Sequence, residues 1–201
     1  MITPIIMESD IEEVKRKLAV LETRKVERIH FDIGDGMFSD LLSVTPRDLH
    51  PFNLTKMKID LHLLVDDPRE WIEECVALSP KRVIGQVEHM GEQKAFIEAV
   101  EGYGAEAGLA LKIETPIEAI VSELLEKVKT ILLLEIPPGT TGSLFDRRVL
   151  GKIGELRKIY SGRILVDGGI NPETYKWAMG EGASEAGANS AWWRGDFNEA
   201  Q

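Results

Sequence analysis

Short apolar runs alternate with longer amphipathic stretches along the whole chain, and this alternation constrains the fold more than any other feature. Such a pattern predicts parallel strands joined by helical crossovers. Eight strand–helix units within 201 residues predict a closed (β/α)8 (TIM) barrel at the small end of its size range, with an open doubly wound sheet as the alternative. The expected strands cover residues 2–7, 26–33, 57–65, 82–88, 107–113, 129–136, 163–167 and 184–190.

The last unit of this pattern is the weakest. The eighth expected strand has few β-branched residues and is a poor strand former by propensity. The chain ends soon after Trp192 and Trp193, which predicts a short or incomplete last helix that leaves both indoles exposed. Exposed aromatic patches often mark interfaces, so a homo-oligomer is expected. No linker or shift in composition divides the chain, so residues 1–201 are expected to form a single barrel domain.

The charge balance argues against several classes of partner. The chain has a net charge of −10 and no Lys/Arg-rich block, which disfavours nucleic acid and anionic membranes as partners. Its longest apolar runs, such as residues 131–134, are far too short to cross a bilayer. No signal-peptide pattern is evident, so a cytoplasmic location is the default. The single cysteine, Cys75, lies in a helical pattern and is expected to be a buried thiol.

Two polar residues interrupt the second expected strand. His30 and Asp32 point the same way, because successive side chains of a strand alternate between its faces. Taken alone, such a pair is more often a buried histidine bonded to an aspartate than two metal ligands. His62 and Asp167 lie near the ends of two further strands, where a barrel carries its functional residues. Buried charges need partners, so the four side chains predict one divalent cation of the Zn, Mn, Fe or Co type. Other polar residues assigned to strand ends are Asp60, Gln86 and Glu88.

Glycines follow the sixth and seventh expected strands. Gly139 and Gly142 lie in one loop, and Gly168 and Gly169 lie in the next. Glycine-rich loops let backbone N–H groups approach a phosphate, and the late strands of a barrel are the usual place for a phosphate. Each glycine alone is more often a simple turn residue. Together with Asn189-Ser190 after the eighth strand, they indicate a phosphate site.

These residues together resemble the ribulose-phosphate 3-epimerase family. Residues 30–38 match its His-x-Asp-x-x-Asp-Gly-x-Phe motif, and residues 60–65 are similar to its Asp-x-His-Leu-Met-Val signature. Thr115-Pro116, which is expected to open the fifth helix, matches a Thr-Pro segment of the family. Residues 138–145 and 166–171 match its phosphate-side loops. The resemblance spans nearly the whole chain.

The resemblance implies an enzyme, a carbohydrate-phosphate isomerase. It would be a 3-epimerase that interconverts D-ribulose 5-phosphate and D-xylulose 5-phosphate through an enediolate. Asp32 and Asp167 would be the acid/base pair, and with His30 and His62 they would also hold the divalent metal ion. No organic cofactor is implied. The residues implied for phosphate or substrate binding are Gly139, Gly142, Ser143, Gly168, Gly169, Asn189 and Ser190.

The chain departs from the family around the substrate. Gly34, Leu64 and Leu134 stand where the family places methionines over the site. Ile5 replaces a serine, and Gln86 replaces a histidine. The missing side chain at Gly34 suggests room for a different or larger ligand. Two alternatives therefore stand beside the pentulose epimerase, namely an epimerase of a hexulose 6-phosphate and a non-catalytic barrel that binds a phosphorylated metabolite.

Overall fold

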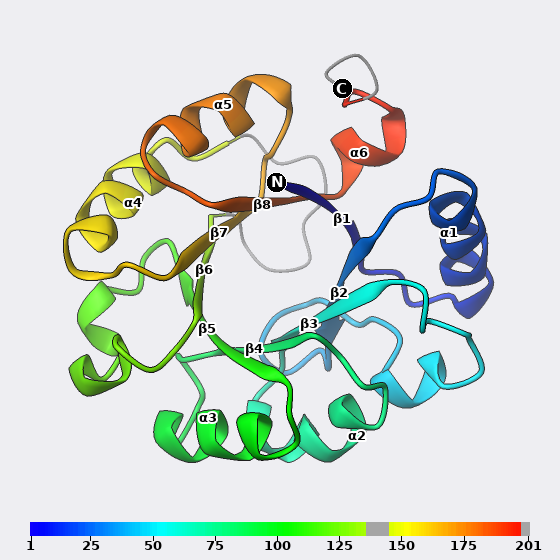
Figure 1. Ribbon diagram of the computed structural model, residues 1–201, viewed down its shortest axis with the longest axis horizontal. Helices are drawn as coiled ribbons and strands as arrows, with labels where there is room; N and C mark the ends of the chain where they lie inside the picture. Colours follow the sequence, from blue (N-terminus) through cyan, green and yellow to red (C-terminus); the bar gives the residue numbers. More distant parts are fainter. Residues whose placement is uncertain (136–144, 198–201) are drawn as a thin grey trace.

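The computed structural model, which describes residues 1–135 and 145–197, forms a closed barrel of eight parallel strands in chain order (Figure 1). The last strand pairs with the first, with Ile2 opposite Ala186, so the predicted barrel is confirmed and the open sheet is not formed. The strands are β1 (Ile2–Ile6), β2 (Arg28–Gly34), β3 (Lys58–Leu64), β4 (Arg82–Gln86), β5 (Glu106–Lys112), β6 (Thr130–Leu134), β7 (Arg163–Asp167) and β8 (Glu185–Ala188).

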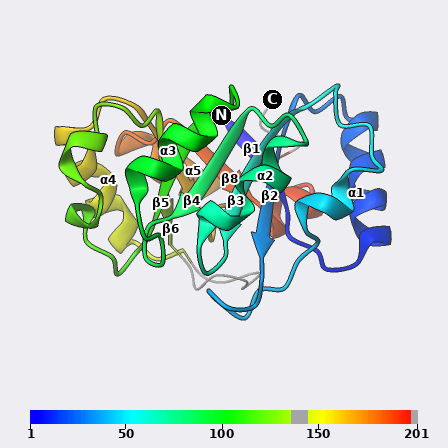
Figure 2. The same ribbon diagram turned by 90° about the horizontal axis from the view of Figure 1, so that it is seen from below.

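Helices flank the strands on the outside of the barrel (Figure 2). Sequence signals set their ends: Asp10 caps α1 by accepting a hydrogen bond from the Glu12 backbone N–H, and Asn171 caps α5 in the same way. The α-helices are α1 (Ile11–Thr23), α2 (Ile72–Val76), α3 (Gln93–Gly102), α4 (Arg148–Ile159), α5 (Pro172–Gly180) and α6 (Ser190–Arg194). The 3-10 turns are η1 (Pro46–Leu49), η2 (Pro68–Trp71), η3 (Ile117–Ala119) and η4 (Ser122–Leu124). None of the described helices is long and apolar enough to span a membrane.

The helix expected to open at Thr115-Pro116 is not formed. Two 3-10 turns, η3 and η4, take its place after β5. Ile120 and Val121, which separate them, both have non-helical backbone conformations. β-branched side chains lose rotamer freedom in a helix, and this pair interrupts the segment. The prediction of a fifth full helix was therefore wrong.

The main core lies between the barrel and its helices. Outward-facing strand residues such as Ile29, Phe31 and Ile33 are fully buried there. A smaller apolar cluster lies inside the barrel toward the carboxyl ends of the strands and includes Leu132 and Leu165. Cys75 is buried in the outer core, and burial raises the pKa of its thiol to about 12. The prediction of a buried thiol is confirmed.

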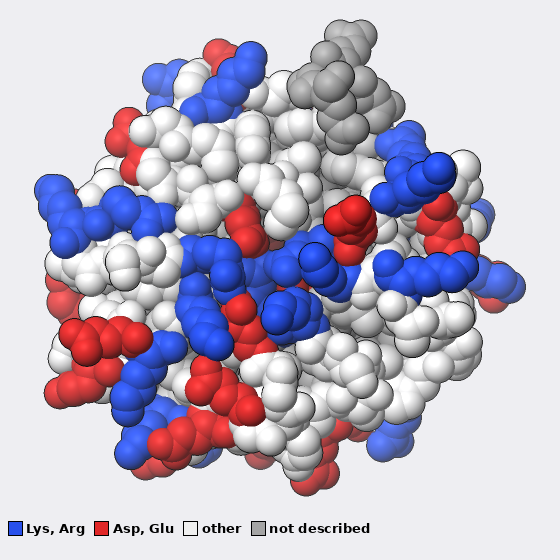
Figure 3. Space-filling model, viewed as in Figure 1, with Lys and Arg blue, Asp and Glu red and all other residues white. Residues whose placement is uncertain are grey.

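A ring of ion pairs closes the amino-terminal end of the barrel, and we call it the base ring. The Arg82 guanidinium, 1% exposed, lies 2.6 Å from Asp60 and 2.7 Å from Glu185. It also donates to the Thr130 hydroxyl at 2.9 Å. Basic and acidic side chains gather at the centre of this face in Figure 3. The members of the ring are Arg28, Asp60, Arg82, Glu106, Thr130, Arg163 and Glu185.

The end of the chain confirms one expectation and overturns another. α6 has only five residues, so the predicted short last helix is formed. The indoles are not exposed as a patch: Trp192 is 9% exposed and stacks under the Arg24 guanidinium. Trp193 is half-buried and donates from Nε1 to the Ile5 carbonyl at 2.8 Å. The prediction of exposed tryptophans was wrong, because both rings pack back onto the barrel, and the homo-oligomer stays a prediction without that support.

Candidate active site

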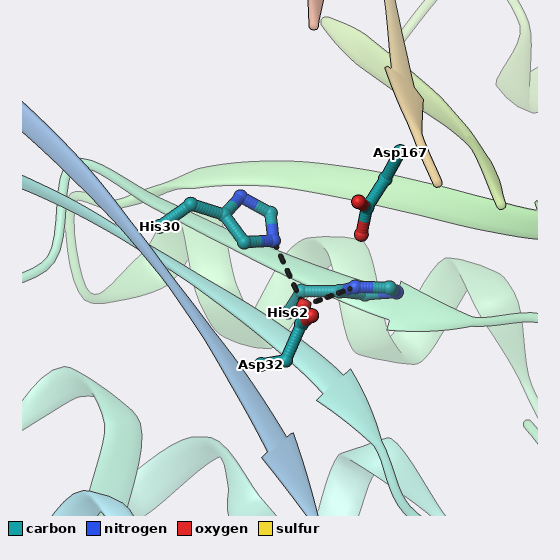
Figure 4. Close-up of side chains that lie close together, drawn as sticks. All are labelled: His30, Asp32, His62 and Asp167. Atoms are coloured by element: carbon teal, nitrogen blue, oxygen red, sulfur yellow. Dashed lines mark hydrogen bonds and ion pairs between the residues drawn. The ribbon is translucent and has the colours of Figure 1, made fainter. Parts of the chain in front are cut away.

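Four buried side chains from three strands meet inside the carboxyl end of the barrel. β2 contributes His30 and Asp32, β3 contributes His62, and β7 contributes Asp167. One ligand atom from each lies within 4.8 Å of those of the other three. Figure 4 shows the four side chains pointing toward one another, with Asp32 between the two imidazoles. The structure thus brings together the four residues that the sequence predicted as metal ligands.

Asp32 contacts both histidines of the cluster and orients their rings. Its Oδ1 lies 3.1 Å from His30 Nε2 and 2.9 Å from His62 Nδ1. The other ring nitrogen of His62 lies 3.2 Å from the Gln86 amide. With the amide oxygen facing the ring, His62 Nε2–H donates to it, and the amide nitrogen donates to Glu88. Nδ1 donates to Asp32 Oδ1 only while it carries a proton. Once that proton is lost, the Nδ1 lone pair faces the cluster, as a metal-binding imidazole requires.

The two carboxyl groups have opposite shifts in pKa. Burial raises the pKa of Asp167, and the nearby Asp32 carboxylate adds to the shift, which reaches about 8. Burial also disfavours the charged form of Asp32, but hydrogen bonds from both histidines outweigh it and hold the pKa of Asp32 well below its usual range. An ionised carboxylate therefore faces a protonated one at neutral pH.

The two histidines also have opposite shifts in pKa. For His30, burial lowers the pKa, but the hydrogen bond to Asp32 and the charges of the nearby carboxylates outweigh it and leave the pKa raised. For His62, burial prevails over the same kind of contact and the pKa is lowered. His62 is thus the side chain of the pair that is more readily neutral, which is the form that binds a metal ion.

The donor set fits a divalent transition-metal ion. Two imidazole nitrogens and two carboxylates are ligands that Zn²⁺ and the neighbouring metals favour. Ligands bound to one ion at roughly 2.0–2.2 Å span at most about 4.4 Å, which is close to the 4.8 Å spread of these atoms. A cation here would balance the charge of Asp32 and lower the pKa of Asp167. The four residues can therefore hold an ion of the predicted type.

Two glycines shape the loop that follows Asp167. Gly168 and Gly169 have φ angles of +117° and +52°, in the region that favours glycine. A Cβ on Gly169 would lie 2.7 Å from the Phe145 Cα, so this part of the loop has no space for a side chain. Glycine at position 169 therefore lets the loop pack closely against Phe145. The role of Gly168 and Gly169 in binding a phosphate stays a prediction.

The other predicted phosphate-side residues lie on either side of this loop in the chain. Asn189 and Ser190 follow β8, the neighbour of β7 in the barrel, and are half-buried at the start of α6. They therefore lie at the same end of the barrel as the glycine loop. Gly139, Gly142 and Ser143 lie outside the described residues.

Gly34 does not open space above the site. A Cβ on Gly34 would lie 2.6 Å from Leu41 Cγ and 2.5 Å from the Leu41 carbonyl oxygen. The loop after β2 folds back onto the strand, and its Ser43 N–H donates to the Gly34 carbonyl at 3.1 Å. The prediction of extra room at Gly34 was therefore wrong, because a loop side chain fills that volume. Leu41 joins an apolar cluster that also contains Phe38, Leu64 and Leu134.

One polar strand residue, Asp60, lies outside the candidate site, and two charged residues at strand ends were not predicted from the sequence. Asp60 is in the base ring, two residues before His62 on β3. Lys112 ends β5 with its Nζ 4.0 Å from the centroid of the Phe38 ring. Glu135 follows β6 and is 2% exposed, and burial raises its pKa to about 9. The available signal for both was a charged residue directly at the carboxyl end of an apolar strand.

The fold and the site together define a (β/α)8 barrel with a buried cluster of two histidines and two aspartates that can hold a divalent cation. The profile of the "Ribulose-phosphate 3 epimerase family" matches residues 1–193, and the chain belongs to this family of isomerases. A ribulose-phosphate 3-epimerase of Treponema pallidum (strain Nichols) is 29% identical over 200 residues, which cover 96% of this chain and 91% of that protein. The Bacillus subtilis (strain 168) ribulose-phosphate 3-epimerase is 25% identical and covers 94% and 90%.

Solved structures with more distant sequences share the fold. N-acetylmannosamine-6-phosphate 2-epimerase from Clostridium perfringens superposes with a TM-score of 0.65 at 14% identity, covering 100% of this chain and 93% of that one. Phosphoribosyl anthranilate isomerase from Thermus thermophilus gives a TM-score of 0.64 at 16% identity, covering 95% and 88%. These likenesses support the barrel architecture alone.

Proposed function

We propose that this protein is a metal-dependent 3-epimerase of a ketose phosphate, with D-ribulose 5-phosphate and D-xylulose 5-phosphate as the leading pair. One observation carries the proposal: Asp32 and Asp167 enter one buried site from β2 and β7, where one oxygen of each lies within 4.8 Å of the other and of the two imidazole ligand atoms. The ribulose-phosphate 3-epimerases of Treponema pallidum and Bacillus subtilis, which match nearly the whole chain, support the substrate.

The two carboxyl groups would divide the proton transfers. The ionised carboxylate takes the proton from carbon 3, beside the ketone, and the carbon–hydrogen electron pair moves into an enediolate. The protonated carboxyl then gives its proton to the opposite face of carbon 3. After one turnover Asp32 holds a proton and Asp167 is ionised, so the reverse reaction uses the same pair in exchanged roles.

The remaining residues would bind and orient. A divalent cation held by His30, Asp32, His62 and Asp167 would supply stabilisation of the negative charge on the enediolate. The Gln86 amide, through its hydrogen bond to His62, would keep that imidazole in the tautomer that binds metal. No organic cofactor is needed for this chemistry.

The sugar phosphate would lie across the mouth of the barrel. Its phosphate would accept hydrogen bonds from backbone N–H groups of the loops after β7 and β8, with Gly168 and Gly169 proposed for this role. Asn189 and Ser190 would add side-chain and backbone donors. Gly139, Gly142 and Ser143 are proposed for the same role. Leu41, packed over Gly34, favours a pentulose over a larger hexulose.

Deuterium exchange tests this proposal directly. Metal-loaded protein incubated with D-ribulose 5-phosphate in deuterated water is expected to incorporate deuterium at carbon 3 and to form D-xylulose 5-phosphate. Metal analysis of the purified protein is expected to find about one divalent ion per chain. Protein that contains metal and binds the sugar without exchange would favour the non-catalytic binding barrel instead.

A further inference from the structure

A cleft opens at the amino-terminal end of the barrel, where β1, β2 and β3 begin. Its volume is about 620 Å³, which is within the range of sites for small molecules. β2 begins at this cleft with Arg28 and reaches the candidate active site with Asp32. The cleft and the candidate active site therefore lie toward opposite ends of the same strand, and no residue lines both.

The side chains around the cleft are mainly cationic. Arg24, Lys25, Arg28 and Lys58 line it, and Glu27 is the one acidic residue in the lining. The chain as a whole has a net charge of −10, so this part of the surface is the reverse of the average. Figure 3 shows basic side chains gathered at this end of the molecule. Clefts lined by charge of one sign concentrate small ions of the opposite sign.

Three of these four cations lack a carboxylate partner. Arg28 is paired within the base ring, whereas Arg24, Lys25 and Lys58 form no ion pair with any residue in 1–135 or 145–197. In the strand register Lys58 lies directly beside Arg28, and like charges side by side on neighbouring strands are destabilising. An anion bound in the cleft would offset this repulsion.

Two of the cations directly follow α1. The Arg24 guanidinium lies over the Trp192 ring, with 4.9 Å between its Cζ and the ring centroid. Stacking fixes the plane of the guanidinium and leaves its in-plane N–H donors free, the geometry that binds a phosphate in a bidentate manner. Lys25 has a φ of +54°, in the region that favours glycine. Cations at this position also offset the dipole of α1, but Lys58 follows no helix, so the dipole does not account for the whole group.

Apolar side chains form the rest of the cleft. They are Ile2, Pro4, Val26, Trp192 and Phe197, together with Met1. A ligand that combines several negative charges with a flat or apolar part would match both kinds of wall.

We propose that this cleft binds a polyphosphate, either as the tail of a nucleotide or as a free inorganic chain. Three unpaired cations match the several charges of a polyphosphate better than those of a single phosphate, and the apolar wall has a place for a nucleobase. The site is separate from the candidate active site, so this inference does not depend on the proposed function.

Calorimetric titrations of the full chain at low ionic strength test the proposal, with ATP, inorganic tripolyphosphate and adenosine as probes. ATP and tripolyphosphate are expected to bind, and adenosine alone is expected to show no measurable binding. The double variant Lys25→Gln, Lys58→Gln is expected to raise the Kd for both anions about 10-fold, because it removes two of the unpaired charges. A nucleotide that binds more tightly than tripolyphosphate identifies the nucleotide as the ligand, whereas equal affinities identify the polyphosphate chain alone.

The matched control is Lys94→Gln, Lys176→Gln, which removes the same charge from exposed positions on α3 and α5 outside the cleft. It is expected to change either Kd by less than about twofold. Thermal melts check that both double variants fold.

Three outcomes would overturn the proposal. The first is no measurable binding of either anion to the unmodified protein. The second is the same Kd in the cleft variant as in the unmodified protein, which would place the anion elsewhere, for example at the mouth of the barrel. The third is an equal loss in the two double variants, which would mean a general attraction to positive charge instead of a site.

Discussion

The barrel holds a buried polar cluster at each end, and the two clusters are built differently. In the base ring, cationic and anionic side chains alternate, and Arg82 lies between Asp60 and Glu185 at 2.6 and 2.7 Å. At the carboxyl end, Asp32 and Asp167 share a site with two imidazoles. No lysine or arginine among the described residues forms an ion pair with either carboxylate.

This difference separates a structural cluster from a functional one. Charges buried in protein need compensation. The base ring supplies it from within the chain, so it needs nothing further to be stable. The cluster at the carboxyl end leaves one carboxyl group, that of Asp167, with a pKa of about 8. A bound cation would supply the positive charge that this cluster lacks. Each prediction below perturbs one of the two clusters and leaves the other intact.

The largest expected effect is on catalysis. Asp32→Asn and Asp167→Asn each remove one of the two proton-transfer groups, so exchange at carbon 3 of D-ribulose 5-phosphate should fall by about 10³-fold or more. Asp66→Asn removes a carboxylate that is 67% exposed near the mouth, and should leave the rate within a few fold. Full exchange by either active-site variant would refute the assignment of the acid/base pair.

The next effect is on stability and belongs to the base ring. Arg82→Met leaves Asp60 and Glu185 buried without their main cation, and should lower the free energy of unfolding by about 3–5 kcal/mol in urea titrations. The triple variant Asp60→Asn, Arg82→Met, Glu185→Gln removes the unpaired charges and should recover much of that loss. A loss under about 1 kcal/mol in the single variant would mean that the ring contributes little to stability.

Metal binding should stabilise only the cluster at the carboxyl end of the barrel. A divalent ion that binds only the folded protein, at 100 times its Kd, should raise the free energy of unfolding by about 2.7 kcal/mol. Thermal melts with and without a chelator measure this shift. Asp167→Asn should show a smaller shift, whereas Arg82→Met should show the full one. Equal shifts in both variants would place the ion outside the four-residue cluster.

The smallest effect is a dependence on pH in the base ring. Burial raises the pKa of Glu106, but hydrogen bonds from Arg163 and Thr130 outweigh it and leave the pKa lowered. A carboxyl with a lowered pKa stabilises the fold above its unfolded pKa of about 4.3, and that stability is lost as the pH falls through the folded value. Glu106→Gln should therefore flatten the acid side of the stability curve, measured by urea midpoints from pH 7 downward. An unchanged curve would mean that Glu106 has the same pKa in both states.

Much of the architecture was predictable because it follows from local patterns. The alternation of apolar runs with amphipathic stretches specified the eight strands, and Asp10 and Asn171 specified the starts of their helices. The His-x-Asp pair and its companions indicated the site, because inward-facing positions at strand ends converge in a barrel. The same rule failed for Asp60. The position of a residue along its strand decides whether its side chain joins the base ring or the cluster at the carboxyl end, and a periodic pattern does not specify that position.

Contacts between distant segments were not predictable from local patterns. The space left by Gly34 is filled by Leu41, which is packed there by the fold of a loop. Trp193 is covered by Lys17 of α1, the first helix of the chain, and Trp192 by Arg24, which directly follows that helix. Lys112 reaches across to the loop after β2. In each case the deciding contact joins parts of the molecule that no short window of sequence contains.

The joining of β8 to β1 has a consequence for how this molecule assembles. Gly187 makes room for Ile5, because a Cβ there would lie 2.6 Å from the Ile5 Cδ1, and the seam pairs Ile2 with Ala186. Pairing between such distant residues carries a high entropic cost and forms slowly. During synthesis β1 therefore waits as an unpaired edge until nearly all of these residues have emerged, and such edges promote aggregation. Closure of the barrel therefore waits for β8, in which Ala186, Gly187 and Ala188 are small residues.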